Sequence, residues 1–260
     1  MRDEVRMNSP AVTLTGLAGL PLVNPGDDLA LLLQTALQRA NIVVKDGDIL
    51  VIAQKIVSKA EGRIVNLNEV VPTVRASALA KEVEKDPRLV EVILSESTDV
   101  IRYRKGVLIV AHRLGFVMAN AGIDRSNSGE DDELVILLPR DPDRSAAGLK
   151  AKIDDGCRAN VGVIINDSFG RAWRNGVVGI ALGAAGVPSL RNMVGMPDLF
   201  GRKLQVTEVA VADELAAAAS LLMGQAAEGL PAVHVHGFAC DAPPLPAAAL
   251  LRRKELDLFR

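Results

Sequence analysis

Apolar residues along the chain alternate between helical spacing and strand-like runs, which predicts a mixed fold. Residues 29–37 have apolar side chains at helical spacing behind Asp27 and Asp28, either of which can cap the helix. Residues 48–53 form a nearly continuous β-branched run, which is typical of a strand buried on both faces. Further helices are expected over 74–96 with a break at Asp86-Pro87, over 143–156, over 213–222 and from about 246; extended or strand segments are expected at 16–23, 98–103, 106–112, 116–119, 161–165, 203–211 and 232–236.

This pattern favours a single α+β domain of two interwoven lobes over residues 17–245. We expect a short leader over 1–16 and a C-terminal helix over 246–260. No Ser/Gly/Pro-rich linker interrupts the chain. The N-terminal segment does not resemble a signal peptide, and no apolar run approaches the roughly 18–20 residues that span a bilayer. We therefore expect a cytoplasmic protein that does not bind membranes.

The composition narrows the functional classes. Hydrophobic residues make up 49% of the 260 residues, so the chain can bury a sizeable core, but only 3% are aromatic. Lys and Arg number 30 against 32 Asp and Glu, which leaves no basic excess for a nucleic-acid backbone. Cys157 and Cys240 are too few for a disulfide scaffold or a structural zinc site. Nucleic-acid binding is not expected, and any phosphate site must be local.

Several familiar motifs are absent. The chain has no G-x-x-x-x-G-K-[ST] and no H-E-x-x-H, and the glycines of 179–186 have the wrong spacing for a dinucleotide site, so close packing is the favoured interpretation of that run. His234 and His236 alternate along a strand and so face the same side, but no third ligand is near them in sequence. A structural or surface role is favoured over a metal site.

Hard oxygen donors gather in two segments. Asp124 and Asn127 lie in a polar loop, and Asp167 with Ser168 follows a buried strand, at the strand end where such proteins place their chemistry. Carboxylate, amide and hydroxyl oxygens suit Mg²⁺ or Mn²⁺, which bridge to substrate phosphates. Taken singly, each Asp would more readily be a turn or capping residue.

Cations accompany these donors. Lys55 and Lys59 lie four residues apart after a strand, while Arg171 and Arg174 closely follow Asp167 and would share a face if that segment were helical. Lysine and arginine beside a divalent ion neutralise polyphosphate and its transition-state charge. A solvated charged surface is the alternative for the lysines, and a hydrophobic anchor is the alternative for Trp173, the one tryptophan of the chain.

Six ordered motifs resemble the coenzyme F420-0:L-glutamate ligase family. They are GLPLV (19–23), PGDDLA (25–30), DGDILVIAQKIVSKAEGR (46–63), NAGIDRSN (120–127), VGVIINDSFGRAWRNGVVGIALG (161–183) and VADELAAAASLLMGQAAEGLPAV (211–233). The resemblance implies a two-lobed fold peculiar to the family and an intertwined homodimer. The activity that it implies is GTP-dependent attachment of L-glutamate to the lactyl-phosphate side chain of a deazaflavin cofactor, followed by extension with γ-linked glutamates. It also implies Mg²⁺ or Mn²⁺ and activation by K⁺.

The resemblance assigns residues to this chemistry. Asp124 and Asp167 would bind one metal, and Ser168 and Gln225 would face a second, although archaeal members have a Glu in place of Gln225. The GTP site would be lined by Leu20, Pro21, Leu22, Val23, Gln54, Lys55 and Lys59, with Asn127 beside the phosphates and Met223, Gly224, Gln225, Ala226, Ala227, Glu228, Gly229 and Leu230 closing around the nucleotide.

The implied mechanism activates the cofactor carboxylate as an acyl phosphate, which the amine of glutamate then displaces. Lys55 and Lys59 would offset developing charge, and Arg171 or Arg174 would hold an anionic substrate. Three alternatives stay open: a related ligase acting on a dehydro form of the cofactor or another carboxylate, a metal-dependent hydrolase of GTP or phosphate esters, and a non-catalytic nucleotide-binding module.

Overall fold

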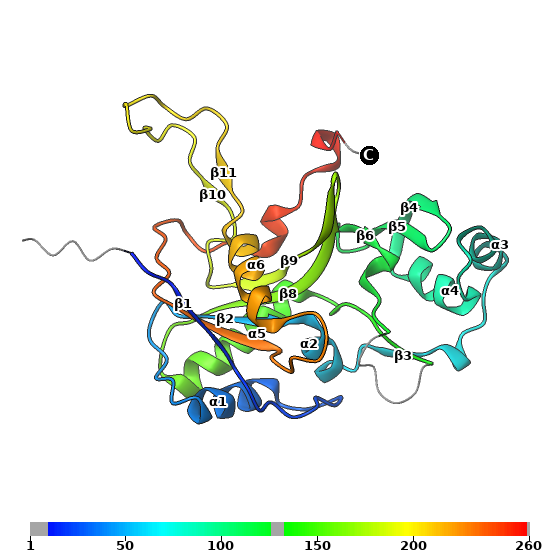
Figure 1. Ribbon diagram of the computed structural model, residues 1–260, viewed down its shortest axis with the longest axis horizontal. Helices are drawn as coiled ribbons and strands as arrows, with labels where there is room; N and C mark the ends of the chain where they lie inside the picture. Colours follow the sequence, from blue (N-terminus) through cyan, green and yellow to red (C-terminus); the bar gives the residue numbers. More distant parts are fainter. Residues whose placement is uncertain (1–9, 126–132, 259–260) are drawn as a thin grey trace, which may run out of the picture.

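A five-stranded mixed sheet forms the centre of the molecule (Figure 1). The computed structural model describes residues 10–125 and 133–258. The sheet has the order β1 (Thr13–Gly16), β12 (Ala232–His236), β2 (Ile49–Ala53), β8 (Gly162–Arg171) and β9 (Arg174–Ala185). β2 and β8 are parallel, whereas the other pairs are antiparallel. The fold is therefore mixed α and β, as the alternating patterns predict.

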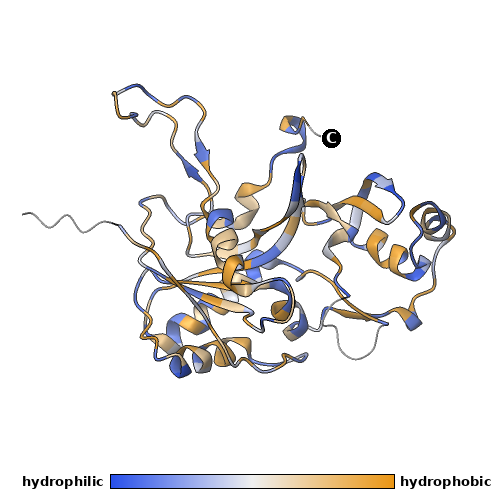
Figure 2. Ribbon diagram, in the orientation of Figure 1, coloured by the Kyte–Doolittle hydropathy of each residue, from blue (hydrophilic) through white to orange (hydrophobic). Residues whose placement is uncertain are grey.

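Helices cover both faces of this sheet. On one face pack α1 (Leu29–Arg39), α2 (Gln54–Ala60) and α5 (Pro142–Cys157), and on the other lies α6 (Val211–Met223). Leu50 and Ile52 point into the first layer, while Val51 between them points into the second. The apolar interior is visible in Figure 2 as orange strands beneath helices with blue outer surfaces. The prediction that residues 48–53 form a doubly buried strand is thus confirmed.

A separate apolar core lies within residues 64–137, which we call the small lobe. It contains β3 (Ile64–Asn66), the short 3₁₀ turn η1 (Leu67–Glu69), α3 (Val74–Val83), α4 (Pro87–Ser95), the antiparallel sheet β4 (Ser97–Arg104), β5 (Val107–His112) and β6 (Val117–Ala119), the turn η2 (Asn120–Gly122) and β7 (Leu134–Ile136). Asp86 caps α4 by accepting from the backbone N–H of Arg88. The predicted break at Asp86-Pro87 and the three predicted strands are confirmed.

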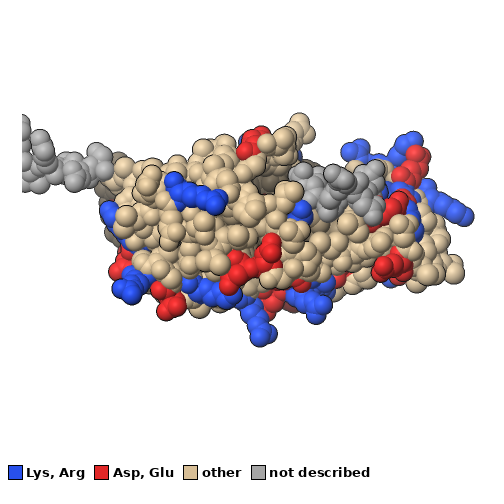
Figure 3. Space-filling view, turned by 90° about the horizontal axis from the view of Figure 1, so that it is seen from below, with Lys and Arg blue, Asp and Glu red and all other residues tan. Residues whose placement is uncertain are grey.

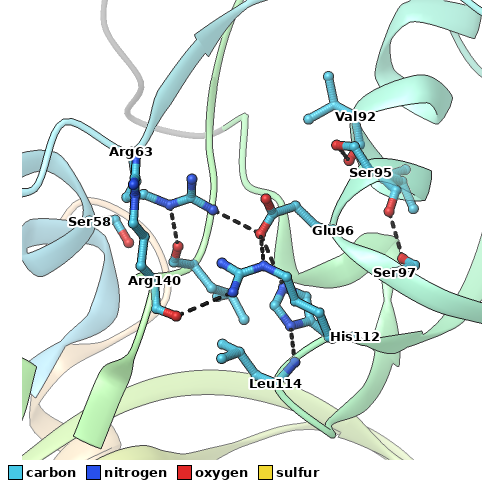
Figure 4. A network of polar contacts seen from close by, with 12 residues as sticks. Ser58, Arg63, Val92, Ser95, Glu96, Ser97, His112, Leu114 and Arg140 are labelled. Atoms are coloured by element: carbon cyan, nitrogen blue, oxygen red, sulfur yellow. Dashed lines mark hydrogen bonds and ion pairs between the residues drawn. The ribbon is translucent and has the colours of Figure 1, made fainter. Parts of the chain in front are cut away.

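A buried carboxylate of the small lobe binds the segment that follows α2 (Figure 4). Glu96, which is 9% exposed, lies between α4 and β4. It accepts from Nη2 of Arg63 at 2.8 Å and from Nε of Arg113 at 3.0 Å. Arg63 also donates from Nε to the carbonyl oxygen of Leu138 at 2.9 Å. The segment after α2 is therefore tied to the strands of the small lobe.

The glycines of β9 allow helices to approach the sheet closely. A side chain at Gly179 would meet the carbonyl oxygen of Ala216 in α6 at 2.5 Å, and one at Gly183 would overlap the carbonyl of Pro142 in α5. The close-packing interpretation of the 179–186 run is confirmed.

Four segments differ from prediction, three in the body of the chain and one near its C-terminal end. β8 runs on to Arg171 because it pairs with β9 along its whole length, so Asp167 and Ser168 lie within a strand rather than after one. Residues 17–23 are irregular, since Gly19 has a φ of +75°. The expected strand 203–211 shrinks to β11 (Glu208–Val209), paired with β10 (Arg191–Asn192) at the base of an arm that projects from the body (Figure 1). There the strands have no core to pack against.

The predicted C-terminal helix is wrong for the described residues. That region forms two 3₁₀ turns, η3 (Ala247–Leu250) and η4 (Lys254–Leu256). Pro243, Pro244 and Pro246 precede the segment, and the adjacent charges of 252–254 repel one another within any helical turn. Among the residues that the structure describes, no helix is both long and apolar enough to cross a membrane. Charges of both signs are interspersed on the face shown in Figure 3.

Candidate active site

A left-handed turn delivers Asp124 to the site. Asn120, Ala121 and Gly122 all have φ between +52° and +66°, which is costly for the two residues that carry a side chain. The backbone of Asp124 then exchanges two hydrogen bonds with Ile136, of 3.0 and 2.8 Å. Any side chain at Gly122 would lie 2.6 Å from Cε of Met118. Backbone strain and close packing together fix the position of the Asp124 carboxylate.

The second carboxylate comes from the middle of β8. Asn166 is in register with Ala53, so Asp167 follows at the edge of the sheet where β2 leads into α2. A bulge after Ile165 shifts the pairing with β9 just before Asp167, as is common beside functional sites. Burial raises the pKa of Asp167 to about 7, and the nearby charge of Asp124 adds to that shift. Two carboxylates therefore share a partly desolvated space.

The lysines lie on α2, which begins directly at the end of β2. Nζ of Lys55 forms a 2.7 Å ion pair with Oδ2 of Asp124. Lys59, one turn later, is half-buried, and burial together with the charge of Lys55 lowers its pKa. The structure thus brings Lys55, Lys59, Asp124 and Asp167 together from segments distant in sequence.

Gln225 reaches the same place from the loop after α6. Its Nε2 donates to Oγ of Ser168 at 2.9 Å. Gly224 turns the chain out of α6 with a φ of +68°, and Glu228 accepts from the backbone N–H of Ala226 at 2.8 Å. The juxtaposition of Ser168 and Gln225 agrees with the expectation that both face one position.

Backbone hydrogen bonds gather the segments expected to bind the nucleotide. The N–H of Gly26 donates to Ala60 at the end of α2, and the N–H of Ala53 donates to Pro231 at the other end. The irregular 17–26 segment and the 223–231 loop therefore flank the same helix. Within them the side chains of Leu22 and Pro21 are exposed, Leu20 is half-buried and Val23 is buried. Gln54 is also buried, with Oε1 accepting from Oγ of Ser58 at 2.8 Å.

A cavity of about 650 Å³ opens beside the carboxylates. Asp124, Asp167, Ser168 and Arg171 line one part of it, and apolar residues of β4, β5 and β6 line another. Nη1 of Arg171 is buried and, among the residues that the structure describes, has no hydrogen-bond partner. Arg171 is therefore placed to receive an anionic group.

Arg171 and Arg174 form the last pair of the β8–β9 hairpin. The helical arrangement considered from the sequence is thus wrong, although the hairpin still sets the two residues opposite each other. Arg174 is exposed, and Trp173 is 87% exposed in a left-handed turn position with a φ of +66°. Among the described residues, Trp173 therefore belongs to none of the apolar core clusters, and the hairpin end is hydrophilic overall (Figure 2).

The predicted contribution of Asn127 lies outside the described residues. Elsewhere, sequence reasoning missed the partner of the two strand histidines: the buried carboxylate of Asp48 bonds Nε2 of His234 at 2.8 Å and Nδ1 of His236 at 2.6 Å. The two histidines do face one side, as expected. Asp48 is buried at the opposite end of β2, and no local signal in the sequence links it to residue 234.

The donor set fits a hard divalent cation. Two carboxylates, a hydroxyl and an amide converge, and burial together with the nearby charge of Asp124 raises the pKa of Asp167. Within the described ranges, no group of three His, Cys, Asp or Glu side chains is arranged to hold a metal alone. Such a site would be completed by other oxygen ligands, as phosphates and waters complete Mg²⁺ sites.

Clustered carboxylates and lysines beside a cavity are typical of enzymes that bind phosphates and a divalent metal. Comparison of the sequence with known proteins identifies the family. The model of the F420-0:Gamma-glutamyl ligase family matches residues 19–237, so the chain belongs to that family. The chain is 48% identical to the coenzyme F420:L-glutamate ligase of Methanothermobacter thermautotrophicus, over 96% of this chain and 99% of that protein. It is 46% identical to the same-named protein of Methanopyrus kandleri, over 92% and 93% of the two chains. The family resemblance seen in the sequence motifs is confirmed.

Proposed function

We propose that the protein is a GTP-dependent ligase that joins L-glutamate to the terminal carboxylate of coenzyme F420-0 or its glutamylated forms. Membership of the family and the names of the relatives support the ligase activity. The observation that carries the proposal is the Lys55–Asp124 ion pair beside Asp167, at the junction of the cavity with α2. Cation and carboxylates meet there as phosphoryl transfer between two bound substrates requires.

The chemistry begins with activation of a carboxylate, which is a poor electrophile in water. A carboxylate oxygen of the cofactor attacks the γ-phosphorus of GTP, and the bond to the β-phosphate oxygen breaks, releasing GDP. The amine of glutamate then attacks the acyl carbon, inorganic phosphate leaves, and the nitrogen gives up a proton as the amide forms. When the γ-carboxylate of an attached glutamate is activated in the same way, the new amide is γ-linked. Lys55 and Lys59 stabilise charge on the transferred group, and Arg171 holds an anionic part of a substrate.

Asp124, Asp167, Ser168 and Gln225 would hold Mg²⁺ or Mn²⁺, which would neutralise phosphate charge. In that arrangement the exposed segment 20–23 and the 223–230 loop would enclose the nucleotide. K⁺ as an activating ion is part of the same proposal, as is a cytoplasmic location.

The proposal includes a homodimer. The arm over residues 191–209 carries Leu199 at 99% exposure and Phe200 at 87% exposure, well away from the body of the protomer (Figure 1). Large apolar side chains so exposed on a projecting hairpin are typical of a surface covered by another subunit. A second copy covering the arms would bury them.

Incubation of purified protein with GTP, Mn²⁺, L-glutamate and F420-0, followed by mass spectrometry, tests the function directly. We expect products heavier by successive glutamyl units and GDP in equal amount. Omission of K⁺, or replacement of GTP by ATP, should lower the yield. GTP turnover that needs neither cofactor nor glutamate would instead indicate a hydrolase, and the absence of adducts with every nucleotide and metal would refute a ligase.

A further inference from the structure

The cavity beside Asp124 and Asp167 has one wall made almost wholly of aliphatic side chains. In β5 and β6, Ile109 pairs with Ala119 and Ala111 pairs with Val117, so these residues share the face of the sheet that points away from the small-lobe core. Leu108 and Val110 alternate with them and face that core. Ile109 and Val117 both line the cavity. The wall is thus the second, non-core face of a three-stranded sheet.

A β-bulge adds a third side chain to this wall. Val100 pairs with Val110 and Arg102 with Ile109, which leaves Ile101 as the extra residue of β4. Val100 packs on the small-lobe core, whereas Ile101 lines the cavity. Bulges redirect single side chains in this way, often next to functional sites. Phe169 of β8 also lines the cavity.

Polar groups complete the cavity on the side of the carboxylates. Asp124, Asp167 and Ser168 line it, as does Arg171 with its buried Nη1. None of residues 20–23, 54–59 or 223–230, where we place the nucleotide, lines the cavity. The cavity is therefore available to the other large substrate, whose reacting carboxylate has to lie near Asp124 and Asp167.

We propose that the Ile101–Ile109–Val117 wall binds the planar deazaflavin ring of the cofactor, with the anionic side chain directed past Arg171 toward Asp167. This inference rests on the proposed function and assigns the ring subsite within it. The aliphatic sheet face and Phe169, which lines the same cavity, provide apolar contact for a planar ring, while the polar residues suit a phosphate and a carboxylate. A volume of about 650 Å³ accommodates a drug-sized ligand of this shape.

The test measures binding of the ring without catalysis. A deazaflavin nucleoside that lacks the phosphate and lactyl groups is titrated into the full-length protein, and ring fluorescence reports its Kd. The variants are Ile101→Asn and Val117→Gln, which place an amide against the ring. Val71→Asn is the matched control, because Val71 is an exposed small-lobe residue that does not line the cavity.

We expect Kd for the nucleoside to rise at least about tenfold in both cavity variants, since an amide buried against a ring loses its hydrogen bonds to water. The control should match the parent protein, and GTP affinity should not change in any variant. If Ile101→Asn fails to fold, as judged by thermal unfolding, Val117→Gln carries the test, because Val117 is the more exposed of the two. An unchanged Kd in a folded cavity variant overturns the ring subsite.

Two further outcomes separate this inference from the function on which it rests. A parent protein that attaches glutamate normally, with KM for F420-0 unaltered in both cavity variants, refutes the ring subsite and leaves the ligase proposal intact. A parent protein that binds the nucleoside through this wall but attaches no glutamate refutes the ligase proposal alone. If the variants change the sedimentation coefficient instead of Kd, the wall is a subunit contact and the inference is wrong.

Discussion

Nη2 of Arg63 donates a 2.8 Å hydrogen bond to Oε2 of Glu96, and this contact joins the turn after α2 to the strands of the small lobe. Arg113 reaches the same carboxylate oxygen, and so does the buried His112 at 3.5 Å. Nδ1 of His112 accepts from the backbone N–H of Leu114, which leaves the proton on Nε2, toward Glu96. One carboxylate thus holds the cavity wall and the lysine-bearing helix in fixed relation (Figure 4).

Removal of this carboxylate charge should destabilise the protein. Glu96→Gln leaves the largely buried guanidinium of Arg63 and the partly exposed one of Arg113 without their counter-charge, for which we expect a loss of about 3 kcal/mol in the free energy of unfolding. Urea unfolding at neutral pH measures it. Glu84→Gln is the matched control, since Glu84 pairs with Lys105 at an exposed site where such pairs contribute at most about 1 kcal/mol. Equal midpoints for the two variants would contradict the structural role of Glu96.

The stabilisation that Glu96 contributes should decrease at low pH. Burial opposes its charge, but hydrogen bonds from His112 and Arg63 outweigh burial and hold the pKa of Glu96 at about 2, below its ordinary value of 4.5. Because the folded-state pKa is depressed, the stabilisation is complete above pH 4.5 and is lost as the pH falls toward 2. The stability difference between the parent and Glu96→Gln should shrink over that interval.

Local pattern in the sequence predicted most elements of the fold because their signals are short-range. The caps at Asp28 and Asp86 and the β-branched run of β2 each specify an element within a few residues. The site was predictable as far as Asp167, because Asp167 closely follows the apolar run 161–165 in the sequence, although β8 itself continues to Arg171. Asp124 was identified through its motif. Its approach to Lys55 depends on the left-handed turn at 120–122, which the sequence Asn-Ala-Gly does not predict.

Contacts between distant segments were not predictable from one sequence. Asp48 and His234 are 186 residues apart, and only the antiparallel pairing of β12 with β2 places them together. The extension of β8 to Arg171 likewise depends on its partner strand, since Gly170 by itself favours no strand. Pairing between distant strands determines these contacts and the length of β8, and no local sequence pattern indicates which strands pair.

The approach of α6 to the sheet depends on Gly179. Gly179→Ala places a methyl group 2.5 Å from the carbonyl oxygen of Ala216, so α6 must shift, at a cost of about 1–3 kcal/mol. Gly170→Ala in β8 is the control, because no atom lies within 4 Å of the added carbon. Chemical denaturation should show a lower midpoint for the first variant only, and an unchanged midpoint would mean that the packing is looser than described.

Subunit association should depend on the tip of the arm. Leu199→Ser removes an apolar side chain that makes no core contact within the protomer, so we expect a shift toward monomers at equal folded stability. Sedimentation velocity measures the shift. Val43→Ser is the matched control, because Val43 is also highly exposed but lies between α1 and β2, away from the arm. A dimer unaffected by the first change would place the interface elsewhere.

Gln225 should limit metal affinity. Its amide donates to Ser168, and Gln225→Glu would add a carboxylate to those of Asp124 and Asp167 at the site, and hard dications prefer such negative oxygen ligands. We expect Kd for Mn²⁺, measured by calorimetry in the presence of GDP, to fall at least about tenfold. Gln205→Glu adds the same charge on the exposed arm and controls for the general field of the protein. Equal affinities in the two variants would exclude Gln225 from the metal site.

Replacement of Asp167 should reduce catalysis without destabilising the fold. Asp167→Asn removes a carboxylate that lines the cavity together with Asp124, the partner of Lys55, and we expect glutamylation to fall at least about a hundredfold. Mn²⁺ should raise the melting temperature of the parent protein through preferential binding to the folded state, but not that of the variant. Asp99→Asn, an exposed change in β4, should keep both the activity and the metal response.

Because burial raises the pKa of Asp167, its carboxylate is costly to hold ionised, so the folded variant should melt no lower than the parent without metal. Full activity in Asp167→Asn would remove this carboxylate from the reaction and with it the proposed metal site.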